Sequence, residues 1–167
     1  MKLDIACGDN KKEGFTGIDI AKIPGVDIVH NLTKYPWPIK SDSVDEINCS
    51  HYIEHVVDLM KFMNEVHRIM KSGAIACFIS PYYTSVRCWQ DPTHVRPISE
   101  QTYLYYNKGW RDVNKLSHYP ITADFNIQQW GHSWNANWIN RSQEAKNFAL
   151  QNYNNVVDDL WAFLVKI

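Results

Sequence analysis

The 167-residue sequence lacks an excess of charge of either sign and lacks any long apolar run. Lysine and arginine total 17 against 18 aspartate and glutamate residues, so the net charge is -1 with neutral histidine. Such a balance gives no electrostatic attraction for nucleic acid or for an anionic membrane. No apolar run is long enough to span a bilayer, and the N-terminus lacks a signal-peptide pattern. We therefore expect a cytoplasmic protein that binds neither nucleic acid nor membrane.

Cysteine is scarce, and its spacing excludes a CxxC metal or redox motif. Three of the four cysteines fall in predicted strands, which indicates buried, reduced thiols. Aromatic residues are abundant instead, with seven Trp and nine Tyr, most of them after residue 80. Core packing accounts for most of them, and the others are expected to line a pocket or a partner surface. The length is that of a single domain over residues 1–167. The four cysteines are Cys7, Cys49, Cys77 and Cys88.

Apolar runs rich in Val and Ile recur through the first half of the chain and predict strands. Their near-continuous hydrophobicity is typical of a parallel sheet that is covered on both faces. Helical spacing follows over residues 51–71, and Ser72-Gly73 is expected to end that helix. The predicted strands are 3–7, 16–20, 26–30, 44–49, 74–80, 121–131 and 160–167; a loop is expected over 82–98, and helices after Ser99 and over 141–158. This alternation predicts an α/β layered sandwich with a mostly parallel central sheet.

The first two predicted strands flank a turn of small residues. Leu3–Asn10 runs into Gly17–Ile20, and Asp19 stands near the end of the second strand. Small residues let the backbone approach a nucleotide-like ligand, and a carboxylate there accepts hydrogen bonds from ribose hydroxyls. Only about eight residues separate these strands, fewer than a parallel crossover normally needs. The usual first helix is therefore expected to be shortened to a turn.

Further motifs follow in a fixed order: Asp27–Leu32, Trp37-Pro38, Asp42–Ile47, Ser50–His55 and Glu65–Ala74. Together with the first two segments, this succession resembles the class I S-adenosylmethionine-dependent methyltransferases, close to the type 11 methyltransferase-domain families. The run Trp89–Pro97 resembles a segment of small, often phage-encoded members. The resemblance implies a Rossmann-like fold, S-adenosylmethionine as cofactor, and methyl transfer to an acceptor that we expect to be a small molecule.

The resemblance also implies which residues hold the cofactor. The glycine-rich motif would surround the amino-acid part of the cofactor, and the acid of the second strand would bind its ribose. The residues after the third strand would flank its adenine, and those after the fourth strand would lie near its sulfonium. These residues are Asp4, Ala6, Cys7, Gly8, Asp19, Ile20, Asn31, Leu32, Ser50 and His51. Ala6 and Asn10 stand where glycine is commoner in the family, and Asn31 stands where Asp often contacts the adenine amine.

Residues of the loop after the fifth strand are the candidates for acceptor chemistry. Asp91, His94 and Arg96 lie where a rigid scaffold usually presents function. His94, or His51 and His55 nearer the cofactor, would take a proton near neutral pH. The candidate catalytic residues are His94, His55 and Asp91, and the candidate substrate residues are Tyr82, Tyr83 and Arg96. In the alternative interpretation, Asp91-Pro92 forms a turn and the other polar residues only hold the loop.

Two short motifs suggest other chemistry. His51–His55 matches H-x-x-E-H, the zinc signature of inverted metalloproteases, with Glu54 as base. A third ligand would have to come from Glu100 or Glu144, and neither lies in a supporting motif, so we expect no metal. Ser80–Tyr83 is similar to the motif of DNA amino-methyltransferases but lacks its second proline, and the chain has no basic surface for DNA.

Two alternative functions stay open at this point. The same site could cleave S-adenosylmethionine without an acceptor, as lyases do, or the chain could be an inactive cofactor-binding or partner module. No residues precede the first strand to form a lid. We therefore expect either residues 82–118 or a second subunit of a homo-oligomer to close the site.

Overall fold

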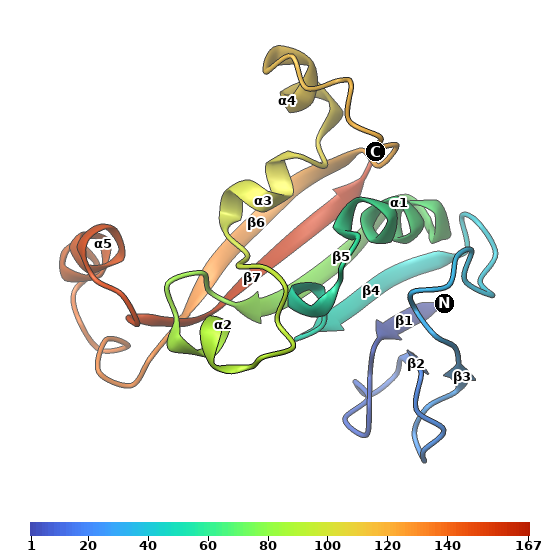
Figure 1. Cartoon of the computed structure of the whole chain (residues 1–167), viewed down its shortest axis with the longest axis horizontal. Helices are drawn as coiled ribbons and strands as arrows, with labels where there is room; N and C mark the ends of the chain where they lie inside the picture. Colours follow the sequence, from blue (N-terminus) through green and yellow to red (C-terminus); the bar gives the residue numbers. More distant parts are fainter.

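The computed structural model describes residues 1–167, which form one seven-stranded sheet with helices (Figure 1). The elements are β1 (Lys2–Ile5), β2 (Thr16–Asp19), β3 (Ile28–Val29), β4 (Val44–Ser50), η1 (Ile53–His55), α1 (Leu59–Ile69), β5 (Met70–Pro81), α2 (Val86–Gln90), α3 (Glu100–Leu104), α4 (Lys108–Val113), β6 (Phe125–Trp134), α5 (Gln143–Asn152) and β7 (Val157–Lys166). No helix is long and apolar enough to cross a membrane.

The strand order is β3-β2-β1-β4-β5-β7-β6. Strands β1 to β5 pair in parallel, β7 runs antiparallel to β5, and β6 runs antiparallel to β7. The predicted α/β fold with a mostly parallel sheet is therefore confirmed. The carboxyl ends of β1, β2, β4 and β5 form one edge of the sheet, which we call the carboxyl edge. Ligands of open α/β sheets bind beyond such an edge.

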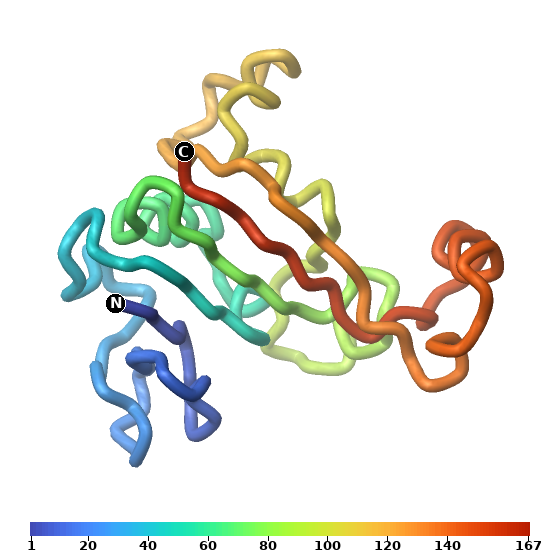
Figure 2. Tube along the Cα trace, turned by 180° about the vertical axis from the view of Figure 1, so that it is seen from behind, coloured from blue at the N-terminus to red at the C-terminus, as the bar shows by residue number.

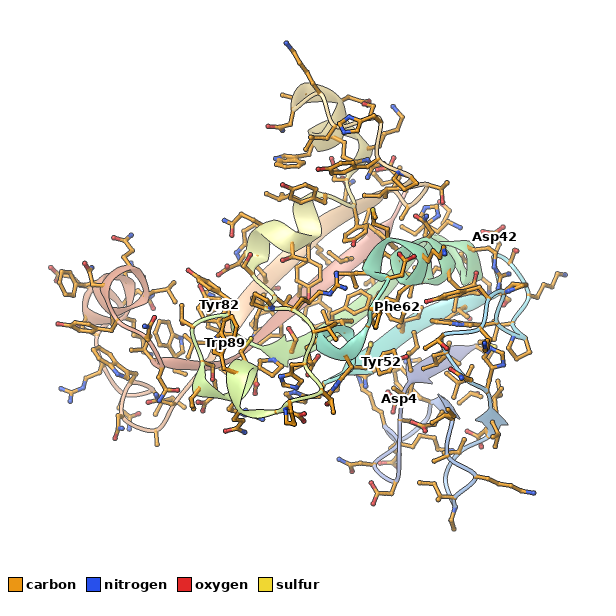
Figure 3. All side chains as sticks on the ribbon, viewed as in Figure 1. Asp4, Asp42, Tyr52, Phe62, Tyr82 and Trp89 are labelled. Atoms are coloured by element: carbon orange, nitrogen blue, oxygen red, sulfur yellow. The ribbon has the colours of Figure 1, made fainter.

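The core lies between the sheet and helix α1. Phe62 of α1 is fully buried and packs its ring edge-on against Trp37 and Phe78, with ring centroids 5.6 and 6.4 Å away (Figure 3). Strand residues such as Ile5 and Ile47 are also fully buried. Removing such side chains from water contributes about 1.5–3 kcal/mol each to folding. Burial of this face fixes the register of the parallel strands.

The opposite face of the sheet carries no helix (Figure 2). The apolar runs predict helices on both faces, but residues 6–15 and 20–27, which connect β1 to β2 and β2 to β3, contain no helix. Ile75 and Cys77 of β5 and Phe163 of β7 are only half-buried on this face. The short first crossover expected from the sequence is confirmed, and it leaves this face open.

Several element boundaries differ from the predictions. The helix predicted over 51–71 is split into η1 and α1, and it ends at Ile69 because Met70 already pairs with Val44. Gly73, expected to end the helix, instead lies within β5 with φ of 77°, near a register shift between β4 and β5. The loop predicted over 82–98 contains α2. The last predicted helix ends at Asn152, because Val157 pairs with Trp134 in the sheet.

Candidate functional site

The loop after β1 is shaped by left-handed backbone and by the carboxylate of Asp19. Ala6 and Gly8 have φ of 54° and 52°. Asp19 Oδ2 accepts a hydrogen bond from Gly8 N at 3.0 Å, and Oδ1 accepts from Ala21 N at 2.8 Å. These bonds orient the carboxylate at the end of β2, beside the small-residue loop. A carboxylate has about four lone-pair sites, so both oxygens can still accept from a ligand.

Asp4 and Cys7 lie on the inner side of this loop. Asp4 is 3% exposed and accepts from Lys12 N at 2.7 Å and from Asn48 Nδ2 at 2.6 Å. Cys7 is buried, and burial raises the pKa of its thiol, which keeps it protonated at neutral pH. A Cβ on Gly17 would lie 2.5 Å from Cys7 Sγ. Asp4 thus links this loop to β4, and Cys7 Sγ lies close to Gly17 of β2.

The residues predicted beside adenine divide into exposed and buried ones. Ile20, next to Asp19, is 65% exposed. Asn31 Oδ1 accepts from Thr33 N at 3.0 Å, which leaves the Asn31 amide NH₂ without a partner in the structure. Leu32 belongs to the buried core, and its backbone carbonyl accepts a hydrogen bond from the indole N–H of Trp37. The exposed apolar surface at this end of the site therefore includes Ile20 and Val29, which pairs with Asp19.

The end of β4 brings His51 to the centre of the carboxyl edge. His51 follows Ser50 with φ of 53°, and its N–H donates to Ile79 O at 2.8 Å. Its Nδ1 lies 3.6 Å from Glu54 Oε1, and this carboxylate raises the pKa of His51 above its usual value, although partial burial opposes the shift. Because His51 is not helical, it does not share a helix face with His55, as the H-x-x-E-H motif would require.

A polar cavity of about 210 Å³ lies beyond β4 and β5. It unites the three predicted catalytic residues, which come from η1 and from the loop after α2. Val95 N donates to Glu54 O at 2.9 Å and ties that loop to η1. The lining residues are His51, Glu54, His55, Pro81, Arg87, Gln90, Asp91 and His94. The sequence interpretation did not name Arg87 or Gln90 as site residues; no motif includes Arg87, whereas Gln90 belongs to the run Trp89–Pro97.

The predicted substrate residues lie around this cavity but do not line it. Tyr82 is 3% exposed, its hydroxyl donates to Glu100 Oε1 at 3.3 Å, and burial raises its pKa (Figure 3). Tyr83 is 40% exposed. Arg96 Nη2 donates to the carbonyl of Val57 at 2.5 Å, so this side chain holds the loop, as the alternative interpretation had it.

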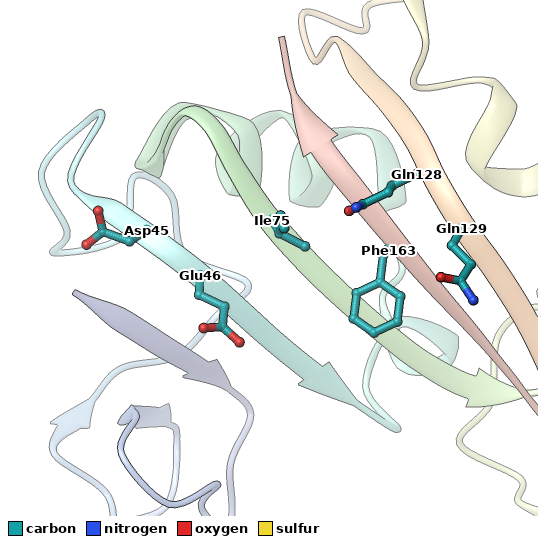
Figure 4. A pocket seen from close by; sticks show the side chains of 6 residues that line it. All are labelled: Asp45, Glu46, Ile75, Gln128, Gln129 and Phe163. Carbon is teal, nitrogen blue, oxygen red and sulfur yellow. The ribbon is translucent and has the colours of Figure 1, made fainter.

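A second cavity of about 410 Å³ lies on the open face of the sheet (Figure 4). Asp45 and Glu46 of β4, Ile75 of β5 and Phe163 of β7 contribute to its lining. Because Asp45 and Glu46 begin β4 rather than end it, this cavity is remote from the carboxyl edge and is not part of the site.

Residues 82–118, one of the two expected lids, divide between the two ends of the sheet. The segment with α2 lies at the carboxyl edge, whereas α4 lies at the other end, beside the start of β6 (Figure 1). Arg111 of α4 is buried there and donates to Tyr105 O at 2.7 Å and Ala123 O at 3.2 Å. Only the first part of the segment therefore lies where it could cover a ligand.

Residues 3–78 match the model of the family described as "Methyltransferase domain", a match just short of half the chain. This confirms the resemblance to class I S-adenosylmethionine-dependent methyltransferases, and the family's cofactor is S-adenosylmethionine. The matched residues contain the whole set predicted to hold that cofactor. A comparison with curated proteins found no match.

Solved structures of the same fold span nearly the whole chain. A SAM-dependent methyltransferase from Archaeoglobus fulgidus is 19% identical, with a TM-score of 0.67 over 99% of this chain and 85% of its own. A putative methyltransferase in complex with the Trm112 activator from Haloferax volcanii is 14% identical (TM-score 0.61, 99% and 81% covered). Phosphoethanolamine N-methyltransferase 2 of Haemonchus contortus, in complex with S-adenosyl-L-methionine, is 14% identical (TM-score 0.54, 99% and 48% covered). These likenesses concern the fold.

Proposed function

We propose that the chain binds S-adenosylmethionine at the carboxyl edge and transfers its methyl group to a small-molecule acceptor held in the polar cavity. The observation that carries the proposal is the oriented carboxylate of Asp19. It stands at the end of β2, beside the left-handed turn after β1, with acceptor capacity left for ribose hydroxyls. Around it, the family model covers the whole predicted cofactor set.

The residues present suit this cofactor. A Cβ on Gly8 would meet nothing within 4 Å, so the backbone there is open to a ligand. Exposed Ile20 offers an apolar surface for a base, and the free amide of Asn31 offers donors to it. Ser50 and His51, at the end of β4, would lie nearest the sulfonium. Asp4, Cys7 and Leu32 would support the site from behind.

For methyl transfer, the main task of the protein is to align the acceptor with the methyl group. S-adenosylmethionine supplies an electrophilic methyl group when bound, and an acceptor held in line with it needs no further activation unless a proton must leave. His51, His55 and His94 line the cavity, and an imidazole there would accept that proton.

Calorimetric titration with S-adenosylhomocysteine tests cofactor binding, because this product cannot turn over. We expect a Kd tighter than about 100 µM, which is about -5.5 kcal/mol. Asp19→Ala should weaken binding at least about tenfold, the equivalent of about 1.4 kcal/mol. Glu13→Ala, at an exposed position that makes no ion pair, is the matched control. Absence of binding by the wild-type chain at millimolar ligand would refute the proposal for the isolated chain.

Product analysis then separates methyl transfer from its two alternatives. Incubation with S-adenosylmethionine alone should leave the cofactor intact; its cleavage would show a lyase. Binding without turnover on any acceptor would favour a module that acts through a partner, and the Haloferax volcanii methyltransferase was solved with such an activator.

A further inference from the structure

Glu54 is the least expected side chain of the polar cavity. It is 1% exposed, and neither of its carboxylate oxygens has a hydrogen-bond partner. A buried carboxylate without donors is strongly destabilising unless a cation lies beside it. Its nearest nitrogen atoms are His51 Nδ1 at 3.6 Å and His94 Nε2 at 3.9 Å, both too far for a hydrogen bond.

The tautomer of His94 can be inferred from its neighbours. His94 Nδ1 lies 2.9 Å from the carbonyl oxygen of Cys88, which can only accept, so Nδ1 carries the proton. In the neutral ring, Nε2 then presents its lone pair to the cavity. That atom is 3.9 Å from Glu54 Oε1 and 3.9 Å from Asp91 Oδ2. A lone pair beside two carboxylate oxygens forms an electronegative pocket that a cation would stabilise.

His55 is held in the same way. Thr93 Oγ1 donates its only proton to Asp91 Oδ1 at 2.6 Å, so it must accept from His55 Nδ1 at 3.0 Å. The Nε2 lone pair of His55 is thereby free as well. Metal-binding histidines typically donate one ring N–H to a carbonyl or polar oxygen in this manner, which orients the other nitrogen.

We propose that Glu54, His55 and His94 bind one divalent transition-metal ion, with Asp91 and His51 next to it. One potential ligand atom from each of the three lies within 4.8 Å of the others. Ligands about 2.1 Å from a metal lie about 3.4–4.2 Å apart, so a contraction of at most about 1.4 Å closes the site. Two imidazoles with one carboxylate favour Zn²⁺ or Fe²⁺ over Mg²⁺ and Ca²⁺.

The potential ligands that the structure brings together differ from those that the H-x-x-E-H motif suggests. Glu100 is paired with His132 at 2.6 Å and is not available, and the ligand that completes the set is His94. His51 lies outside the set because of its left-handed backbone. The site is therefore not that of an inverted metalloprotease.

Three protein ligands leave coordination positions open, as in catalytic metal sites. An acceptor oxygen bound there would have its hydroxyl pKa lowered and would lie near the methyl donor. This consequence, an oxygen acceptor that coordinates the metal, rests on the proposed function; the metal site itself does not.

Titration of the chelator-treated chain with Zn²⁺, without cofactor, tests the site. We expect one Zn²⁺ per chain, and at least about tenfold weaker binding in His94→Ala and in Glu54→Gln. His118→Ala, at an exposed histidine, should bind like the wild type. Absence of one-to-one binding, or equal binding by all variants, would overturn the proposal.

A measurement on the wild-type chain avoids any folding defect of the variants. Sub-stoichiometric Mn²⁺ should broaden the NMR signals of the His55 and His94 rings and leave His30 and His118 sharp. Uniform broadening would show that Mn²⁺ does not bind specifically at this site and would overturn the proposal. A His94 ring that carries a proton on both nitrogens and does not respond to metal would show that a proton supplies the positive charge instead. S-adenosylhomocysteine binding is measured separately, so failure of the metal site and failure of the proposed function are distinguishable.

Discussion

Gly131 of β6 lies opposite Trp161 of β7, and a Cβ on Gly131 would come within 2.1 Å of the indole ring. The ring thus lies over the glycine on the open face of the sheet. We expect Gly131→Ala to destabilise the fold by about 1–3 kcal/mol, because the indole must move. Chemical denaturation measures this. Gly109→Ala in α4, where the nearest contact would be 3.4 Å, should instead be neutral or stabilising; equal losses in both variants would contradict the role given to Trp161.

Ala6 and Gly8 share a left-handed backbone but carry different side chains. Ala6→Gly should stabilise the chain by about 1 kcal/mol, because an L-residue is strained there, and Gly8→Ala should destabilise it by a similar amount. Thermal unfolding of the two variants checks the opposite signs. A destabilised Ala6→Gly would mean that the loop gains nothing from glycine at the position where the family commonly has it.

Glu65 connects α1 to the segment before β4. It accepts from Trp37 N at 2.6 Å and from Arg68 Nε at 2.8 Å. Burial alone raises the pKa of Glu65, but the bonds from Arg68 and the Trp37 N–H outweigh it, and the pKa is lowered. Its contribution to stability is therefore present above the unfolded pKa of about 4.3 and is lost as pH falls through the folded value.

Glu65→Gln should cost about 1.5–3 kcal/mol at pH 7, the range for hydrogen bonds to a charged group. Urea unfolding at pH 7 and near pH 3 measures the free energy of unfolding of both proteins. The difference between variant and wild type should be smaller at the lower pH. Glu13→Gln, exposed and without an ion pair, serves as control. A difference in the free energy of unfolding that does not change with pH would show that the carboxylate charge is unimportant.

Asp45 and Lys71 pair at the start of β4 and β5, with 2.6 Å between Oδ1 and Nζ. The Lys71 ammonium, together with the terminal amino group, lowers the pKa of Asp45 to about 2. Any stabilisation from this carboxylate is present above about pH 4 and is lost as pH falls toward 2. An NMR titration should find this low pKa and a clear rise in Lys71→Ala. An unchanged value would show that the lysine is not its cause.

The first strands and the mostly parallel sheet could be predicted because each strand depends on a local apolar run. Leu3–Asn10 and Gly17–Ile20 indicated the loop and its acid directly. The polar cavity could not be predicted in the same way. Glu54 and His94 are distant in the chain and meet because bonds such as Val95 N to Glu54 O and Thr93 Oγ1 to His55 Nδ1 tie the loop to η1. Spacing suggested that His51 and His55 share a helix, but His51 itself has a left-handed backbone and η1 begins only at Ile53.

Helix boundaries were predicted less well, for a physical reason. Helical periodicity continues through Met70, but this residue gains a strand partner in Val44, and tertiary pairing overrides local preference. The same competition shortens α5, since Val157 pairs with Trp134. The sequence alone does not show which strand will pair with a given segment.

The missing helices between β1, β2 and β3 have a thermodynamic consequence for the cofactor half of the chain. These short strands are joined to the rest of the sheet by the β1–β4 ladder, by the bond from Asn48 to Asp4 and by the ion pair of Lys2 with Glu46. Local opening of this region should therefore require less free energy than global unfolding. A ligand that contacts both the loop after β1 and the end of β4 would therefore stabilise the folded state of this region. Its binding energy would appear as a higher melting temperature and slower amide exchange in residues 2–30.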